Sequence, residues 1–127
     1  MDATVLVRHL TGDPAELAAR ATAFLYGNEK LLLTDLVVAE TVSVLEAFYE
    51  APRDTIAQAM RSLLAFDAIV CLDAPLLLRA VELYETAGTG FIEAYLVACA
   101  ETTGVDRIVS FEAAIDRAAT VDRIEPP

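Results

Sequence analysis

The sequence is short of the side chains on which several common kinds of protein chemistry depend. It has no tryptophan, one histidine (His9) and two cysteines, and its nine Lys and Arg stand against twenty Asp and Glu, for a formal net charge of −11. Without a His and Cys pattern, a zinc site of the usual kind is excluded, and no serine motif lies near His9 to suggest a catalytic triad. The shortage of basic residues argues against a protein that coats nucleic acid.

Long apolar runs are also missing. Charges interrupt the sequence every few positions, and no stretch approaches 18 uninterrupted apolar residues, so a membrane span is excluded. The first residues lack the positive charge of a signal peptide, and we therefore expect a cytoplasmic protein. Cys71 and Cys99 both lie in apolar runs, which favours buried free thiols over a disulfide in that compartment.

Hydrophobic residues are abundant, at 56% of the 127 residues, with a mean hydropathy of +0.48. A chain of this size can bury a core without a disulfide or a structural metal, and we predict a single domain over residues 1–127. The charge of −11 fits a soluble protein, a partner for a basic protein, or a site that collects divalent cations.

Short apolar runs alternate with helical patterns along the chain. We predict strands over residues 31–33, 68–72, 107–110 and 120–124, with residues 1–3 as the stub of a first strand. The helical patterns cover residues 5–10, 14 to about 27, 73 to about 86 and 91 to about 103, with two more starting near 35 and 53, and Asp13 is expected to cap the second helix. This alternation predicts a three-layer α/β domain, in which helices cover both faces of a parallel sheet of short strands.

Four acids fall at strand ends or early in the helices that follow, where α/β sheets place their sites: Asp2, Glu40, Glu93 and Glu112. Glu40 and Glu93 have apolar sequence neighbours, and a carboxylate is costly to bury there unless something compensates its charge. A hard divalent cation such as Mg²⁺ or Mn²⁺ would do so. The alternative is that twenty acids place some at helix starts by chance, where the helix dipole favours them anyway.

Five segments, in order, resemble motifs of the PIN-domain family, and of its VapC-type members in particular. They are DATVLVRHL (2–10), LTDLVVAE (33–40), FIEAYLVA (91–98), VSFE (109–112) and the ending RIEP (123–126). The resemblance covers nearly the whole chain, and it implies a PIN-like domain.

The resemblance further implies a metal-dependent endoribonuclease, the toxin half of a VapBC toxin–antitoxin pair. One or two Mg²⁺ or Mn²⁺ ions would activate a water for attack on an RNA phosphodiester. Asp2 and Glu93 would be direct metal ligands, while Glu40 and Glu112 would complete the acidic pocket or orient metal-bound waters. The residues implied to support these carboxylates from further out are Thr4, Ser110 and Asp116.

The implied partners are a VapB-type antitoxin, an RNA of the tRNA or rRNA class, and a second copy of the chain in a homodimer. The family usually has Asp where this chain has Glu93 and Glu112, which leaves open a degenerate domain that binds RNA or antitoxin without cleavage. A DNase or other phosphodiesterase on the same metals is a third alternative. Arg8, His9 and Arg20 are either contacts for RNA phosphates or part of a solvated face.

Overall fold

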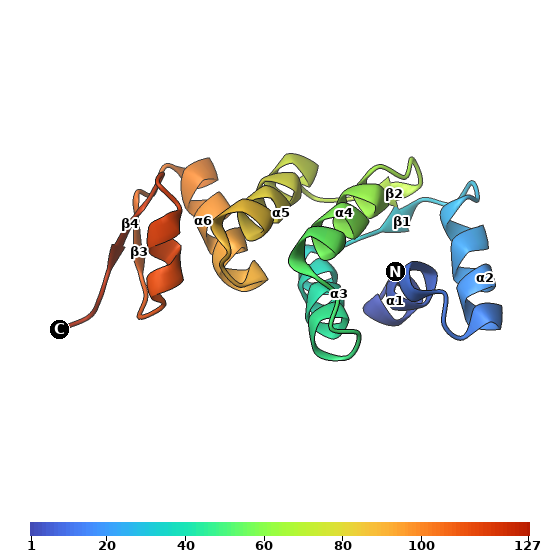
Figure 1. Ribbon diagram of the computed structural model, residues 1–127. Helices are drawn as coiled ribbons and strands as arrows, with labels where there is room; N and C mark the ends of the chain where they lie inside the picture. Colours follow the sequence, from blue (N-terminus) through green and yellow to red (C-terminus); the bar gives the residue numbers. More distant parts are fainter. The chain divides into compact units, whose positions relative to one another are not determined.

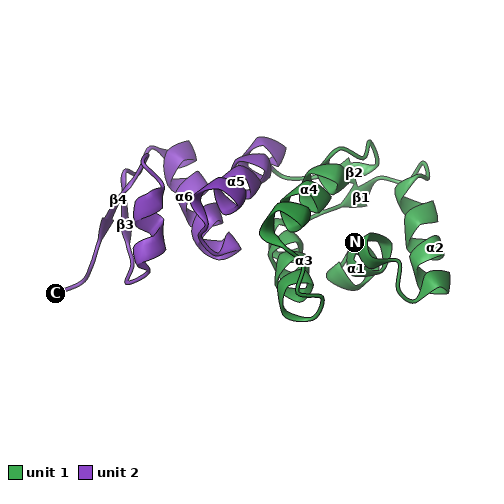
Figure 2. Ribbon diagram, viewed as in Figure 1, with its two compact units in different colours: residues 1–72 green, residues 73–127 purple.

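The computed structural model describes residues 1–127, which form two compact units, 1–72 and 73–127 (Figures 1 and 2). The predicted class is confirmed, because helices alternate with short strands and every strand pair is parallel. The strands pair two by two, one pair in each unit. The single domain over residues 1–127 stays a prediction.

Unit 1 contains four helices and the strand pair β1–β2. Its elements are α1 (Ala3–Thr11), α2 (Ala15–Leu25), β1 (Leu31–Leu32), α3 (Asp35–Ala47), α4 (Arg53–Leu64) and β2 (Ile69–Val70). Leu31 pairs with Ile69 in the sheet, and α1 packs against both α2 and α3. The Thr34 side chain caps α3 by accepting a hydrogen bond from the Val37 N–H, as expected for a Thr before a helix.

Two predictions about the N-terminal part of the chain, one for residues 1–3 and one for Asp13, are wrong. Residues 1–3 are not a strand: α1 begins at Ala3, because the Asp2 side chain accepts the Val5 N–H and caps the helix. Met1 nevertheless contacts the sheet, since its amino group donates to the Leu32 carbonyl at 2.9 Å. Asp13 does not cap α2; Pro14 holds that position with extended backbone angles and the helix starts one residue later.

Unit 2 consists of α5 (Ala74–Ala87), α6 (Phe91–Thr103), β3 (Arg107–Val109), the 3₁₀ helix η1 (Ala113–Arg117) and β4 (Asp122–Ile124). Helices α5 and α6 pack against each other, and η1 contacts both of them. In the sheet, Ile108 of β3 pairs with Arg123 of β4. Phe91 begins α6 as predicted, whereas η1 has no counterpart among the predicted elements.

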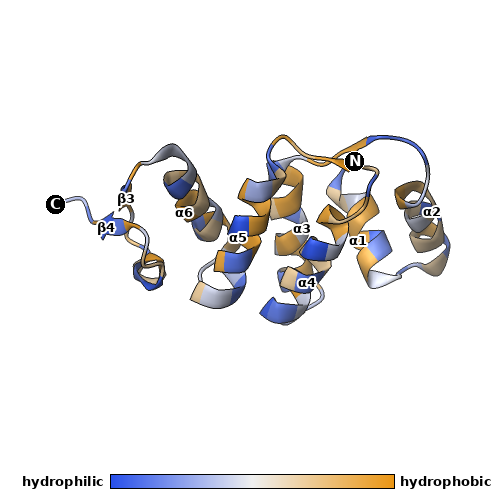
Figure 3. Cartoon of the chain, turned by 90° about the horizontal axis from the view of Figure 1, so that it is seen from above, coloured by the Kyte–Doolittle hydropathy of each residue, from blue (hydrophilic) through white to orange (hydrophobic).

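Apolar side chains form a core in each unit. Hydrophobic and hydrophilic residues alternate along α1, α4 and α5, so each helix has an apolar side to bury (Figure 3). Fully buried side chains include Leu6, Leu33 and Ile56 in unit 1, and in unit 2 the ring of Tyr84, which meets Phe91 edge to face at 5.9 Å. Both cysteines are free thiols, as predicted, although each is half-buried. No helix has the length and apolar content needed to cross a bilayer.

Candidate functional site

Asp2 lies at the start of α1 with its carboxylate exposed and oriented by its neighbours. Its Oδ1 accepts a hydrogen bond from the Thr4 hydroxyl at 2.6 Å and a longer one from the Val5 N–H at 3.4 Å. The Thr4 hydroxyl, and then the Val5 amide, hold the pKa of Asp2 below its usual value. The side chain is therefore ionised at neutral pH, and Oδ2 is left to face a ligand. Thr4 thus makes a hydrogen bond to this carboxylate, and its role as a supporting residue of a metal site stays a prediction.

Glu40 is an exposed residue of α3 and belongs to the same unit as Asp2. It lines a hollow of about 450 Å³ together with Ala3 and Thr4, the two residues that follow Asp2. Because α1 packs against α3, the fold of unit 1 brings Glu40 to the same hollow as the start of α1.

Glu93 lies in the first turn of α6, half-buried, and its carboxylate folds back over Gly90. A Cβ placed on Gly90 would overlap that carboxylate, so the missing side chain at position 90 creates the space that the carboxylate fills. A helix N-terminus favours a negative charge at this place. The position of Glu93 thus depends on a glycine that the sequence analysis did not single out.

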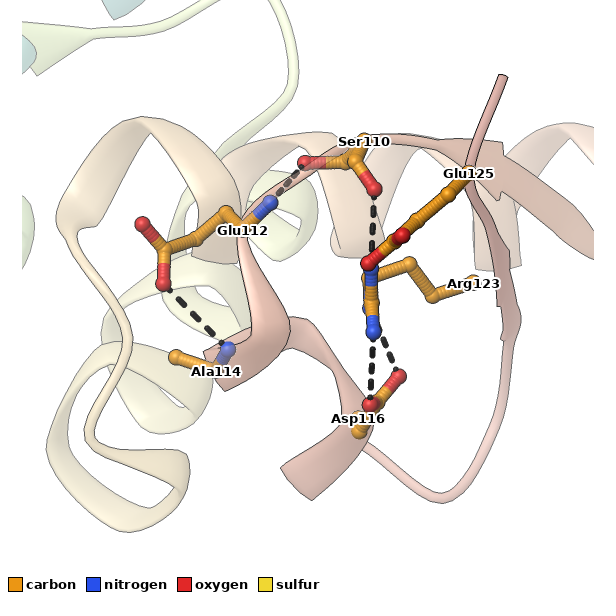
Figure 4. A network of polar contacts seen from close by, with 6 residues as sticks. All are labelled: Ser110, Glu112, Ala114, Asp116, Arg123 and Glu125. Carbon is orange, nitrogen blue, oxygen red and sulfur yellow. Dashed lines mark hydrogen bonds and ion pairs between the residues drawn. The ribbon is translucent and has the colours of Figure 1, made fainter. Parts of the chain in front are cut away.

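Glu112 is exposed and caps η1, because its Oε1 accepts the Ala114 N–H at 3.3 Å (Figure 4). Its own N–H donates to the Ser110 hydroxyl oxygen at 2.9 Å. Ser110 was predicted to hydrogen-bond a carboxylate. Its hydroxyl instead receives the backbone N–H of Glu112, so it holds the chain that carries the carboxylate.

Asp116 is committed to another partner in this structure. Its two oxygens accept hydrogen bonds from Nε and Nη2 of Arg123, at 2.9 and 3.1 Å, in a bidentate pair (Figure 4). The Arg123 guanidinium holds the pKa of Asp116 below its usual value. The role predicted for Asp116, a supporting member of the acidic site, stays a prediction.

The predicted acids divide between the units, with Asp2 and Glu40 in unit 1 and Glu93 and Glu112 in unit 2. Within neither unit do three or more His, Cys, Asp or Glu side chains gather closely enough to hold a metal ion. In unit 2 the acid-bearing elements are linked: η1 packs against α6, and Arg117 of η1 donates from Nη1 to the Gly88 carbonyl just before α6.

Basic residues accompany the acids of unit 1. Arg8 lines the hollow that contains Glu40, and it also lines a second hollow of about 380 Å³ with Arg20 and the exposed ring of Phe24. His9 instead belongs to a packed contact, because its Nδ1 lies 2.7 Å from the Thr22 hydroxyl and its ring meets Phe66 edge to face. Of the three basic residues considered for RNA phosphates, the two arginines line surface hollows.

Comparison with known protein families gives a match to the PIN domain over residues 1–121. The fold of short parallel strands between helices agrees with this match, and the chain belongs to the PIN domain family. Proteins of this family are generally nucleases that use divalent metal ions. Comparison with curated proteins finds no match.

Two residues that the structure ties to the acids, Gly90 and Arg123, had no predicted role in the site. Gly90 had a local signal, since a glycine just before a helix and three residues before a glutamate leaves room for the side chain to fold back. Arg123 belongs to the quoted ending RIEP (123–126), but nothing in the sequence indicates its partners, because Ser110 and Asp116 lie 13 and 7 residues away and the pairing of β3 with β4 brings them together.

Proposed function

We propose that this protein is a Mg²⁺- or Mn²⁺-dependent endoribonuclease of the VapC type, the toxin component of a type II toxin–antitoxin pair, acting in the cytoplasm. The observation that carries the proposal is the PIN domain match over residues 1–121, a range that spans all four acids. Asp2 and Glu93 are proposed as direct metal ligands, with Glu40 and Glu112 completing the set or orienting bound waters.

The chemistry of this donor set fits such an ion. Four carboxylates offer the hard oxygen ligands that Mg²⁺ and Mn²⁺ prefer. Thr4 holds the pKa of Asp2 low through Oδ1, and the cap at Glu112 uses only Oε1, so the second oxygen of each carboxylate could bind an ion. The missing side chain at Gly90 leaves space for the Glu93 carboxylate. A bound ion would supply Lewis-acid activation of water and stabilise charge on the leaving oxygen.

The chain's own contribution is to orient these oxygens before an ion arrives. The Asp2 and Glu112 carboxylates each accept a backbone N–H at a helix start, and the Thr4 hydroxyl also holds the pKa of Asp2 below its usual value. Arg8 and Arg20 line a neighbouring hollow and are suited to attract the phosphates of an RNA strand in a chain that otherwise repels them.

The test is a calorimetric titration of Mn²⁺ into the purified protein, beside its Asp2→Asn variant. Asn is as good a helix cap as Asp, so the variant should keep the start of α1 and its thermal stability. It should lose Mn²⁺ binding and, with tRNA and rRNA as substrates, cleavage. The matched control is Asp67→Asn, which removes the same charge from an exposed residue of unit 1.

Each outcome separates the alternatives. Binding and cleavage that vanish in Asp2→Asn but survive in Asp67→Asn support the nuclease. A folded wild-type protein that takes up no Mn²⁺ at millimolar concentration would instead support a degenerate domain that binds RNA or antitoxin, and cleavage of DNA in preference to RNA would support the DNase alternative. Undiminished cleavage by Asp2→Asn would rule out the assignment of Asp2.

We also propose a VapB-type antitoxin and a homodimer as the protein's assemblies. Basic side chains of an antitoxin would complement the charge of −11. Exposed apolar residues such as Leu36, Phe48 and Leu72 offer area for protein contacts, each with more than four fifths of its surface accessible. Light scattering on the purified protein tests the dimer, and loss of Mn²⁺ binding on adding a candidate antitoxin tests the inhibitor.

A further inference from the structure

Arg123 is the most heavily engaged charged side chain of unit 2. It lies on β4 with only 12% of its side chain exposed. Its Nε and Nη2 bind the Asp116 carboxylate at 2.9 and 3.1 Å, and its Nη1 donates to the Ser110 carbonyl at 2.9 Å and to Oε1 of Glu125 at 2.7 Å (Figure 4). A single guanidinium therefore joins β4 to two points of the segment that follows β3.

Those two points enclose Glu112. Ser110 begins the segment and Asp116 lies on η1 near its end, so Arg123 holds the chain on both sides of the acid. Ser110 extends the connection, because its carbonyl accepts from Arg123 while its hydroxyl accepts the Glu112 N–H at 2.9 Å. Ser110 alone thus connects the Arg123 guanidinium to the backbone of Glu112. Phe111, between Ser110 and Glu112 in the sequence, is largely exposed and adds little packing.

We propose that Arg123 is a positioning residue, which fixes the Glu112 carboxylate for a divalent cation by clamping residues 110–116. This inference rests on the proposed function. Arg123 itself contacts neither the cation nor the substrate, and its action depends on the planar fork of the guanidinium, which binds the carboxylate and the carbonyl at the same time. A lysine at this position would keep the charge but lose the fork.

A purely electrostatic role for Arg123 makes the opposite prediction. Its positive charge is paired with two carboxylates, of Asp116 and Glu125, and reduces the attraction of this loop for a cation. If charge were its only contribution, Arg123→Met would bind Mn²⁺ more tightly and Arg123→Lys would bind it unchanged. If position matters, both variants bind more weakly. The sign of the change therefore distinguishes the two roles.

The experiment is a Mn²⁺ titration of the full chain and of Arg123→Lys and Arg123→Met, each confirmed as folded by circular dichroism. We expect both variants to bind about 10- to 100-fold more weakly, the range typical of residues that support metal ligands. Amide hydrogen exchange gives a second readout that needs no metal. In both variants residues 110–117 should exchange faster than in the wild type, and this acceleration should be larger there than elsewhere in unit 2.

The matched control is Arg79→Lys. Arg79 also binds a carboxylate through Nε and Nη2, at 2.8 and 2.9 Å, but its partner is Glu101 and the pair joins α5 to α6. Its substitution should lower stability without changing Mn²⁺ affinity. Ser110→Ala gives an independent variant, because it removes the hydroxyl that accepts the Glu112 N–H and leaves the Arg123 contacts in place; it too should weaken binding.

Failure of the inference and failure of the proposed function look different. A wild-type protein that does not bind Mn²⁺ overturns both. A wild type that binds, beside Arg123 variants that bind equally well or more tightly, overturns the positioning role alone. An Arg79→Lys variant that loses as much affinity as Arg123→Lys also overturns it, since the effect would then be one of general stability.

Discussion

Replacing Gly90 with alanine should weaken cation binding while leaving the fold almost unchanged. The backbone at Gly90 has φ −63° and ψ 160°, angles that alanine adopts freely, so the substitution introduces no backbone strain. Alanine is a poorer helix cap than glycine, but it also restricts the unfolded chain. These two effects oppose each other at roughly 0.5–1 kcal/mol each, so Tm should change by less than about 4 °C.

The new methyl group acts on Glu93. It would occupy the space of the Glu93 carboxylate, which must move by about 1 Å to restore van der Waals separation. Metal–ligand distances tolerate errors of only about 0.2 Å, so we expect the Mn²⁺ dissociation constant to rise about tenfold, or about 1.4 kcal/mol. Calorimetry measures this change directly. Adding Glu93→Asp to Gly90→Ala should recover part of the affinity, because the shorter side chain withdraws from the methyl group.

A specific result would refute this reasoning. If Glu93→Gln abolishes Mn²⁺ binding and Gly90→Ala leaves it unchanged, then Glu93 is a ligand whose present position over Gly90 has no importance. If Gly90→Ala instead lowers Tm by 10 °C or more, the premise that alanine fits this backbone is wrong.

Two further predictions concern stability. Burial lowers the pKa of His9 below its ordinary value of about 6.5, so the unfolded chain binds the proton more readily and stability should fall as pH drops through 6.5. The free energy of unfolding, measured with urea between pH 5 and 8, should therefore change less with pH in His9→Gln than in the wild type. An equal change with pH in the two proteins would contradict the assignment. Arg79→Met should cost about 1 kcal/mol, allowing for solvent screening of a partly exposed pair, because it leaves Glu101 without its bidentate partner. Glu101→Gln with Arg79→Met should then cost no more than Arg79→Met alone, and a fully additive loss would argue against their coupling.

Most helices could be predicted because their signals are local. Thr34 and Asp73 each accept an N–H three residues on and start a helix where the sequence indicated, and α6 begins at Phe91. The strands were found in place but are shorter than predicted, at two or three residues, because a strand extends only as far as its partner runs beside it. Residues 1–3 show the same dependence: the cap at Asp2 turns the chain into a helix before a strand can form.

The candidate site was predictable to the extent that it is local. Thr4 lies two residues from Asp2, and its hydrogen bond to that carboxylate was anticipated. The contact of Ser110 took another form, because a 3₁₀ helix follows and directs the Glu112 N–H toward the hydroxyl. The contacts of Arg123, in the quoted ending RIEP, could not be predicted, since only the register of β3 and β4 brings it to Ser110.

The capping role of two of the acids has a consequence for how occupancy of a site could be followed. Helix ends are where fraying starts, and a backbone amide held by a cap exchanges with solvent when that cap opens. Asp2 holds the Val5 amide and Glu112 holds the Ala114 amide, each through one oxygen, so a ligand on the other oxygen would restrain the cap as well. The amide exchange rates of Val5 and Ala114, one in each unit, should therefore fall when a cation binds. Measuring them can detect a bound cation before any substrate is known.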